Sequence, residues 1–152
     1  MLRRTLTSLM AAVVATAGLG AFATATATAD TEHQNTWEKK YWQDKDDGDA
    51  GGISISERAH QVPATGQRVD AHFQALGENL IIQDSHDNGR AAVAKLWVGG
   101  NGPAVFYGKG DGTERIITRL SYAEGQTVHL QVCTSDAPNA VCTTKEKHPG
   151  RT

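Results

Sequence analysis

The chain has 152 residues, of which 15 are Lys or Arg and 17 are Asp or Glu, so its formal net charge is −2. Removal of Arg3 and Arg4 with an N-terminal leader would leave 13 basic and 17 acidic residues, a formal net charge of −4. A mildly acidic chain has no electrostatic reason to bind nucleic acid or an anionic membrane, and the roughly 120 residues that remain make one domain.

The first residues have the order of a secretory signal peptide. A basic start precedes an apolar stretch from Leu9 to Ala23, and a run of Ala and Thr follows. The stretch is shorter than the ~20 apolar residues with which a helix crosses a bilayer. Small residues favour cleavage after Ala29, before Asp30, with cleavage after Ala27 as the alternative. We therefore expect a cleaved signal helix over residues 1–29, a secreted extracellular protein, and no membrane association after cleavage.

The next segment, residues 30–52, is polar and charged. Its only large apolar side chains are Trp37, Tyr41 and Trp42. Trp37 and Tyr41 have the i,i+4 spacing of one helical face, which permits a short helix. Polar N-terminal segments of this kind are commonly loose, so we predict a partly disordered N-terminal arm.

Residues 53–144 consist of short β-type runs separated by turn residues. Apolar and polar side chains alternate within the runs, as at Val69, Ala71 and Phe73. The predicted strands cover residues 53–55, 69–75, 80–82, 91–98, 104–107, 116–120, 128–133 and 140–143. Seven or eight short strands at even spacing predict an all-β fold, an antiparallel β-sandwich. Residues 145–152 follow as a C-terminal tail.

The segment QDSHDNGR, residues 83–90, places a Ser, a His and two Asp close together in the sequence. Its Asn-Gly pair lies between two alternating runs and predicts a two-residue hairpin loop. In such a hairpin Asp87 faces Arg90, whereas Ser85 and His86 point to opposite faces of the sheet. Side chains on opposite faces cannot share a proton, so we interpret the segment as a turn and predict no catalytic residues.

Cys133 and Cys142 are the only cysteines. In an exported chain they are expected to form a disulfide, with two free thiols as the alternative. A closed loop of about ten residues would stabilise the fold by roughly 3 kcal/mol.

Metal and cofactor motifs are missing from the sequence. The histidines lack zinc-site spacing, and the acidic stretches 44–49 and 84–89 both fail the EF-hand pattern. We predict no metal and no cofactor, and calcium binding of another type by the acidic arm stays open.

A more specific pattern is LSYAEGQTVHLQVC, residues 120–133. A leucine and an acidic-glycine turn precede a strand in which Val128, Leu130 and Val132 alternate with polar residues. The pattern resembles the corner between the fifth and sixth strands of immunoglobulin-like and fibronectin type III-like sandwiches, without the tyrosine of that corner. With the leader, DNGRAAVAKLWV and NAVC, the chain resembles a group of small exported β-rich proteins of actinobacteria. The resemblance implies an immunoglobulin-like fold and export, and no reaction.

Exposed aromatic side chains are the remaining functional lead. If alternate positions from Ala92 to Val98 face the core, Lys95 and Trp97 face outward, and Phe106 or Tyr107 could lie beside the indole. Exposed aromatic rings suit sugar stacking or a protein partner. The opposite facing would bury Trp97 as part of the core.

The function that we predict is a monomeric, secreted, non-catalytic binding or interaction module. Its partner would be an extracellular protein or polysaccharide, and its possible binding surface would contain Lys95, Trp97 and Tyr107. A small secreted hydrolase with an unrecognised site is the alternative.

Overall fold

The computed structural model describes residues 36–110, 115–145 and 148–152, which form strands and no helix. The strands are β1 (Thr36–Lys45), β2 (Ile53–Val62), β3 (Arg68–Gln74), β4 (Asn79–Asp84), β5 (Val93–Val98), β6 (Asn101–Tyr107), β7 (Arg115–Arg119), β8 (Thr127–Cys133) and β9 (Gly150–Arg151). Within these described ranges no helix is long and apolar enough to cross a membrane. The predicted signal helix and its cleavage sites at Ala27 and Ala29 lie outside the described residues.

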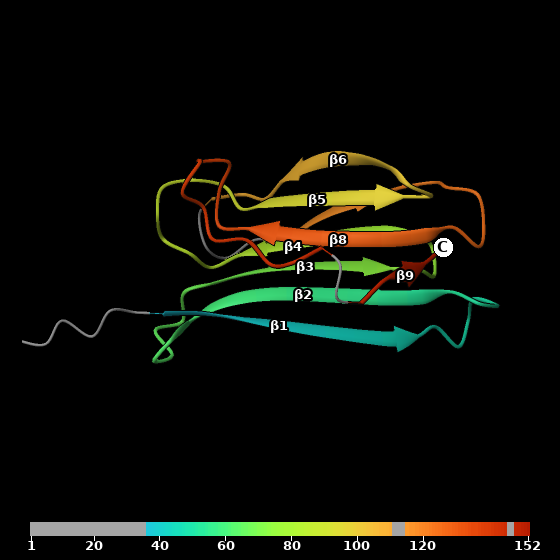
Figure 1. The fold of residues 1–152 in the computed structure, drawn as a ribbon, viewed down its shortest axis with the longest axis horizontal. Coiled ribbons are helices and arrows are strands. Elements are labelled where there is room, and N and C mark those ends of the chain that lie inside the picture. Colours follow the sequence, from blue (N-terminus) through green and yellow to red (C-terminus); the bar gives the residue numbers. More distant parts are fainter. Residues whose placement is uncertain (1–35, 111–114, 146–147) are drawn as a thin grey trace, which may run out of the picture. The chain divides into compact units, whose positions relative to one another are not determined.

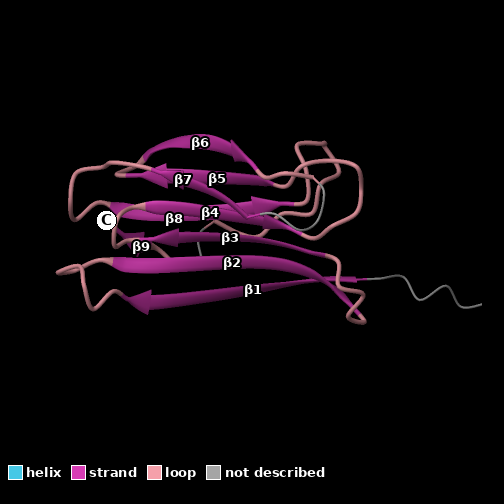
Figure 2. Ribbon diagram, turned by 180° about the vertical axis from the view of Figure 1, so that it is seen from behind, coloured by secondary structure: helices cyan, strands magenta, loops and turns pink. Residues whose placement is uncertain are grey.

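Neighbouring strands are antiparallel throughout and follow the order β6-β5-β8-β9-β2-β3-β4-β7, with β1 paired to β2 (Figure 1). The two residues of β9 join the halves, because Arg151 pairs with both Ile53 of β2 and Thr127 of β8. β2 and β3 also contact β8, so the sheet curls over its own inner face (Figure 2). The prediction of an all-β, antiparallel fold is confirmed.

The core lies between these two halves. Successive side chains of a strand point to opposite faces, so one face of each alternating run is removed from water. The buried apolar side chains include Ile55, Val69, Phe73, Leu80, Ile82, Leu96, Leu130 and Val132. Ala92, Ala94, Leu96 and Val98 all belong to this cluster, which decides between the two facings that the sequence left open for this run.

The described part of the segment predicted as a loose arm, residues 36–52, is mainly a strand. β1 pairs with β2 along its whole length, from Thr36 opposite Val62 to Lys45 opposite Ile53. The i,i+4 spacing of Trp37 and Tyr41 fits a strand as well as a helix, because four is also a multiple of the strand period of two. Trp37 packs against the core, and the Tyr41 hydroxyl accepts a hydrogen bond from the Thr144 backbone at 3.0 Å.

The hairpin predicted at QDSHDNGR is wrong. β4 pairs with β3 and β7, whereas β5 pairs with β6 and β8, so this segment crosses from one half of the sheet to the other. The predicted contact between Asp87 and Arg90 is replaced by an ion pair of Arg90 with Asp136, at 3.8 Å.

Asp84 explains why the segment crosses over. Its side chain is fully buried at the end of β4, where its carboxylate accepts hydrogen bonds from the backbone N–H of His86 at 2.9 Å and of Ala92 at 2.6 Å. A buried carboxylate must be hydrogen-bonded, and these two donors fix both ends of the loop. Asn88 and Gly89 therefore form a bend within a crossover loop, not the turn of a hairpin.

The predicted disulfide is confirmed. Cys133 and Cys142 are bonded, and the two residues also form an isolated antiparallel bridge. The strand predicted over 140–143 is reduced to this one bridge, and β9 pairs with the opposite end of β8, at Thr127 and Val128.

Candidate functional site

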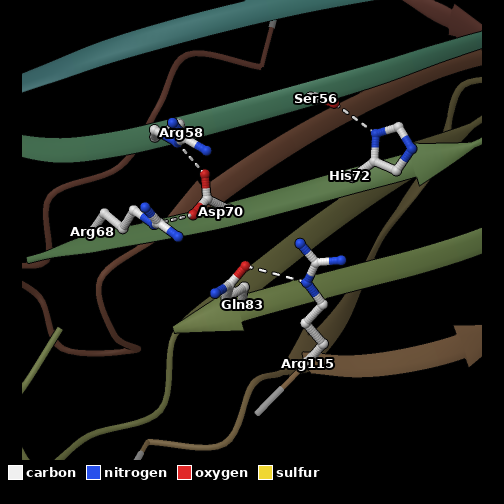
Figure 3. A network of polar contacts seen from close by, with 7 residues as sticks. All are labelled: Ser56, Arg58, Arg68, Asp70, His72, Gln83 and Arg115. Carbon is white, nitrogen blue, oxygen red and sulfur yellow. Dashed lines mark hydrogen bonds and ion pairs between the residues drawn. The ribbon is translucent and has the colours of Figure 1, made fainter. Parts of the chain in front are cut away.

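A groove of about 370 Å³ runs across the outer face of β1, β2, β3, β4 and β7. Strand alternation turns the polar residues of these strands away from the core, so they gather on this face. We call this hollow the outer groove; the side chains that line it include Trp42, Ser56, Arg58, His72, Gln83 and Arg115. Figure 3 shows the polar contacts among these residues, without Trp42.

Two arginines share one carboxylate at the edge of the outer groove. Asp70 forms an ion pair with Arg58 and a second with Arg68 at 3.1 Å. The Arg58 guanidinium also lies over the Trp42 ring, 5.2 Å from its centroid, in a cation–π contact. Two positive charges against one negative charge leave this end of the groove with a positive surplus.

A serine and a histidine form the floor. The Ser56 hydroxyl and His72 Nδ1 are hydrogen-bonded at 2.6 Å, across the β2–β3 pair. Burial lowers the pKa of His72 below its usual value of 6.5, outweighing a hydrogen bond to the Ile55 backbone and the attraction of Asp44 and Asp46. The ring is therefore neutral at pH 7, with one nitrogen as donor and the other as acceptor.

Arg115 forms the opposite wall from β7. Its Nε donates to the side-chain oxygen of Gln83 at 3.3 Å (Figure 3). Among the described residues no acidic side chain forms an ion pair with Arg115. Ile81 lines the groove beside it, and Ile117, its cross-strand partner, is exposed on the same face. This wall thus offers a guanidinium next to apolar surface.

Glu57 lies behind the outer groove, between Ser56 and Arg58 in the sequence, with its side chain on the inner face. It is 4% exposed and accepts a hydrogen bond from the Thr143 hydroxyl. Burial raises the pKa of Glu57 to about 7, and hydrogen bonds from Thr143 and the Val132 backbone oppose the rise. This carboxyl couples β2 to the segment that follows the disulfide.

The structure places Lys95, Trp97 and Tyr107 on the outer face of the other half of the sheet. Trp97 is half-buried and carries Lys145 Nζ over its ring at 4.8 Å, whereas Tyr107 is 54% exposed. Of the two facings that the sequence left open, the structure has the one in which Trp97 faces outward, although its side chain is only partly exposed. Their role as a binding surface stays a prediction.

The expected aromatic neighbour of Trp97 is missing. Tyr107 pairs with Val93, and Phe106 points inward against the core. Gly102 lies beside Trp97 instead, at φ +124°, and a Cβ there would lie 2.7 Å from the Leu96 carbonyl oxygen. Phe106 lies opposite Ala94, so the register of β5 and β6 sets both aromatic residues of β6 three or four positions away from Trp97.

The Ser, His and Asp residues of QDSHDNGR do not form a catalytic site. The Nδ1 of His86 is hydrogen-bonded to the Gln67 side chain at 2.8 Å, and its ring contacts Trp37 edge-on at 4.9 Å between centroids. Across the described part of the chain, no group of three or more His, Cys, Asp or Glu side chains is arranged to hold a metal ion.

Sequence reasoning missed the outer groove, although part of the signal was present. Asp70 and His72 alternate with core residues in β3, which indicates an exposed polar face and nothing more specific. Trp42 lay in the segment predicted as an arm, and the approach of β7 to β4 could not be read from spacing. No protein family model, curated protein or solved structure matches this chain, so its function has to be argued from the groove itself.

Proposed function

We propose that this chain is a secreted, non-catalytic binding module that holds an extracellular polysaccharide or protein in the outer groove. The observation that carries the proposal is the convergence of an indole, two guanidinium groups and a neutral Ser–His pair around one hollow of about 370 Å³. Five paired strands hold these side chains in fixed register, so little conformational freedom is lost on binding.

Export is part of the proposal. The leader-like order of residues 1–29 and the pairing of Cys133 with Cys142 both support it, since disulfides persist mainly outside the reducing cytosol. We also propose that the protein acts as a monomer.

Of the predicted immunoglobulin-like sandwich we propose only the two packed layers and not the strand order. The facing of β2 and β3 toward β8 supports a two-layer arrangement. The predicted sandwich begins with β2, so β3 is its second strand. In immunoglobulin domains the second strand pairs with the fifth, whereas β3 pairs with the next strand, β4, so the strand order of this protein is not that of an immunoglobulin domain.

A hydrolase is the second candidate, and one observation favours it. Ser56 and His72 lie at the hydrogen-bond distance of a nucleophile and its base, and the lowered pKa of His72 leaves its ring able to accept a proton. A third group normally orients the base, and among the described residues no carboxylate is hydrogen-bonded to the His72 ring. Binding therefore accounts for the groove more completely than catalysis does.

The test is capture by the protein purified from the medium of an exporting host. Immobilised neutral and acidic polysaccharides, cell-wall material and extracellular proteins would be offered to the parent protein and to the variants Trp42→Ala and Trp97→Ala. The two variants are matched, because each removes an indole from the outer face of one half of the sheet. We expect capture that Trp42→Ala abolishes and Trp97→Ala retains, with folding of both checked by thermal unfolding.

The opposite pattern would transfer the binding site to the surface of Lys95, Trp97 and Tyr107. Release of a product from any of these materials, lost in both Ser56→Ala and His72→Ala, would replace the binding proposal by the hydrolase.

A further inference from the structure

The charges of the outer groove select a class of ligand. Arg58 and Arg115 line the outer groove together with Asp44 and Asp70, and Arg68 is a second arginine that pairs with Asp70. The chain as a whole is acidic, with a formal net charge of −2. Asp70 is shared by two arginines, whereas no acidic side chain of the described residues forms an ion pair with Arg115, so the positive charge that can attract an anionic group lies at Arg115.

Arg115 is the arginine best placed to receive that group. Arg58 is already engaged by Asp70 and by the Trp42 ring, whereas the partner of Arg115 is the neutral oxygen of Gln83. A guanidinium pairs with a carboxylate through two parallel hydrogen bonds, and such charge-assisted bonds are about twice as strong as neutral ones.

The rest of the groove suits sugar hydroxyls and a sugar ring. Ser56, neutral His72 and Gln83 offer both donors and acceptors, as hydroxyl groups require. Trp42 is 42% exposed at the rim, and a flat apolar ring surface suits the C–H face of a pyranose.

The surface continues beyond one sugar ring. A smaller hollow of about 140 Å³ shares Arg58 with the outer groove and is lined by Lys40, His60 and Arg68. The cationic side chains of Lys40, Arg58 and Arg68 therefore extend the polar surface along the sheet, beside the pair of His60 with Glu38, and a polymer could follow them.

We propose that the outer groove binds an acidic polysaccharide, one whose pyranose rings carry carboxylates, and that Arg115 pairs with a ligand carboxylate. The inference rests on the proposed binding function and names its ligand class. Trp42 supports a ring of the polymer, while Ser56, His72 and Gln83 bind its hydroxyl groups.

The experiment compares three probes that separate charge from sugar. Polygalacturonate carries carboxylates on pyranose rings, its fully methyl-esterified form has the same rings without charge, and polyphosphate has charge without rings. We expect the purified protein to bind polygalacturonate, to lose that binding as salt rises, and to bind the ester and polyphosphate at least tenfold more weakly, about the effect of one hydrogen bond to a charged group.

The decisive variant is Arg115→Gln, with Arg119→Gln as its matched control. Both remove one positive charge from the exposed face of β7, but Arg119 does not line the groove. We expect Arg115→Gln to weaken polygalacturonate binding about tenfold or more and Arg119→Gln to leave it nearly unchanged, with equal unfolding midpoints.

Equal binding of the acid and its ester, or equal losses in the two variants, would overturn the inference. If neutral polymers or proteins were captured in a manner sensitive to Trp42→Ala, the proposed function would stand without this ligand class. Failure of every probe in both panels would remove both proposals.

Discussion

Glu57 makes the stability of this fold dependent on pH. Its side chain is 4% exposed on the inner face of β2, and the Thr143 hydroxyl donates a hydrogen bond to it. Burial raises its pKa from 4.5 to about 7 in the native protein, whereas the unfolded chain returns the carboxyl to its ordinary value.

The magnitude follows from the difference between these two pKa values. Between pH 4.5 and about 7 the native protein holds a proton that the unfolded chain has released. As far as Glu57 determines it, the free energy of unfolding is highest below the unfolded pKa of 4.5 and falls until the pH has passed the folded pKa of about 7. Each pH unit in that window lowers the free energy of unfolding by about 1.4 kcal/mol, so the total loss is about 3 kcal/mol.

The assay is denaturant unfolding of the parent protein and of Glu57→Gln, followed at several pH values from about 4 to 8. Glutamine has nearly the same shape and does not titrate, so it removes this pH dependence. His72 acts in the opposite direction, because its lowered pKa makes the native state more stable as pH rises, but it is present in both proteins and cancels in the difference. A difference between the two free energies that stays constant with pH would refute the reasoning.

Two further predictions concern stability. Replacing Cys133 and Cys142 together by Ala should lower the free energy of unfolding by up to roughly 3 kcal/mol, because the closed loop restricts the unfolded chain; an unchanged denaturation midpoint would contradict this. Gly150→Ala should lower the thermal midpoint, because a Cβ there would lie 2.7 Å from the Ile53 carbonyl oxygen, an overpacking cost of about 1–3 kcal/mol. In the control Gly48→Ala the added Cβ meets the movable end of a leucine side chain, so a drop as large as that of Gly150→Ala would count against the packing argument.

The fold was predictable where a strand has one buried and one solvent-exposed face. The alternation of Val69, Ala71 and Phe73 indicated a strand with one buried face, because burial of one face fixes a period of two. The pairing of strands was less accessible. Asn88-Gly89 has the composition of a hairpin, but the strand pairings show that the chain crosses over there, with the buried carboxylate of Asp84 hydrogen-bonded to both ends of the loop.

The candidate site was harder to predict than the fold. Trp42, Ser56, His72 and Arg115 come from four different strands, and their convergence depends on the order in which β1, β2, β3, β4 and β7 pair. Alternation shows that each side chain faces outward, but it cannot show which outward side chains become neighbours. Even for Trp97, alternation left two facings open, because it does not show which of the two alternating sets of residues faces the core.

The most direct test of binding in the outer groove uses the indole N–H signals of the three tryptophans in a two-dimensional NMR spectrum. Trp42 lines the groove, Trp97 lies on the other half of the sheet, and Trp37 packs against the core. The spectrum would be recorded while short oligomers of a polymer that the protein captures are added. Binding in the groove predicts that the Trp42 signal shifts with ligand concentration while the Trp97 and Trp37 signals stay in place. A shift of the Trp97 signal with an unmoved Trp42 signal would contradict the assignment.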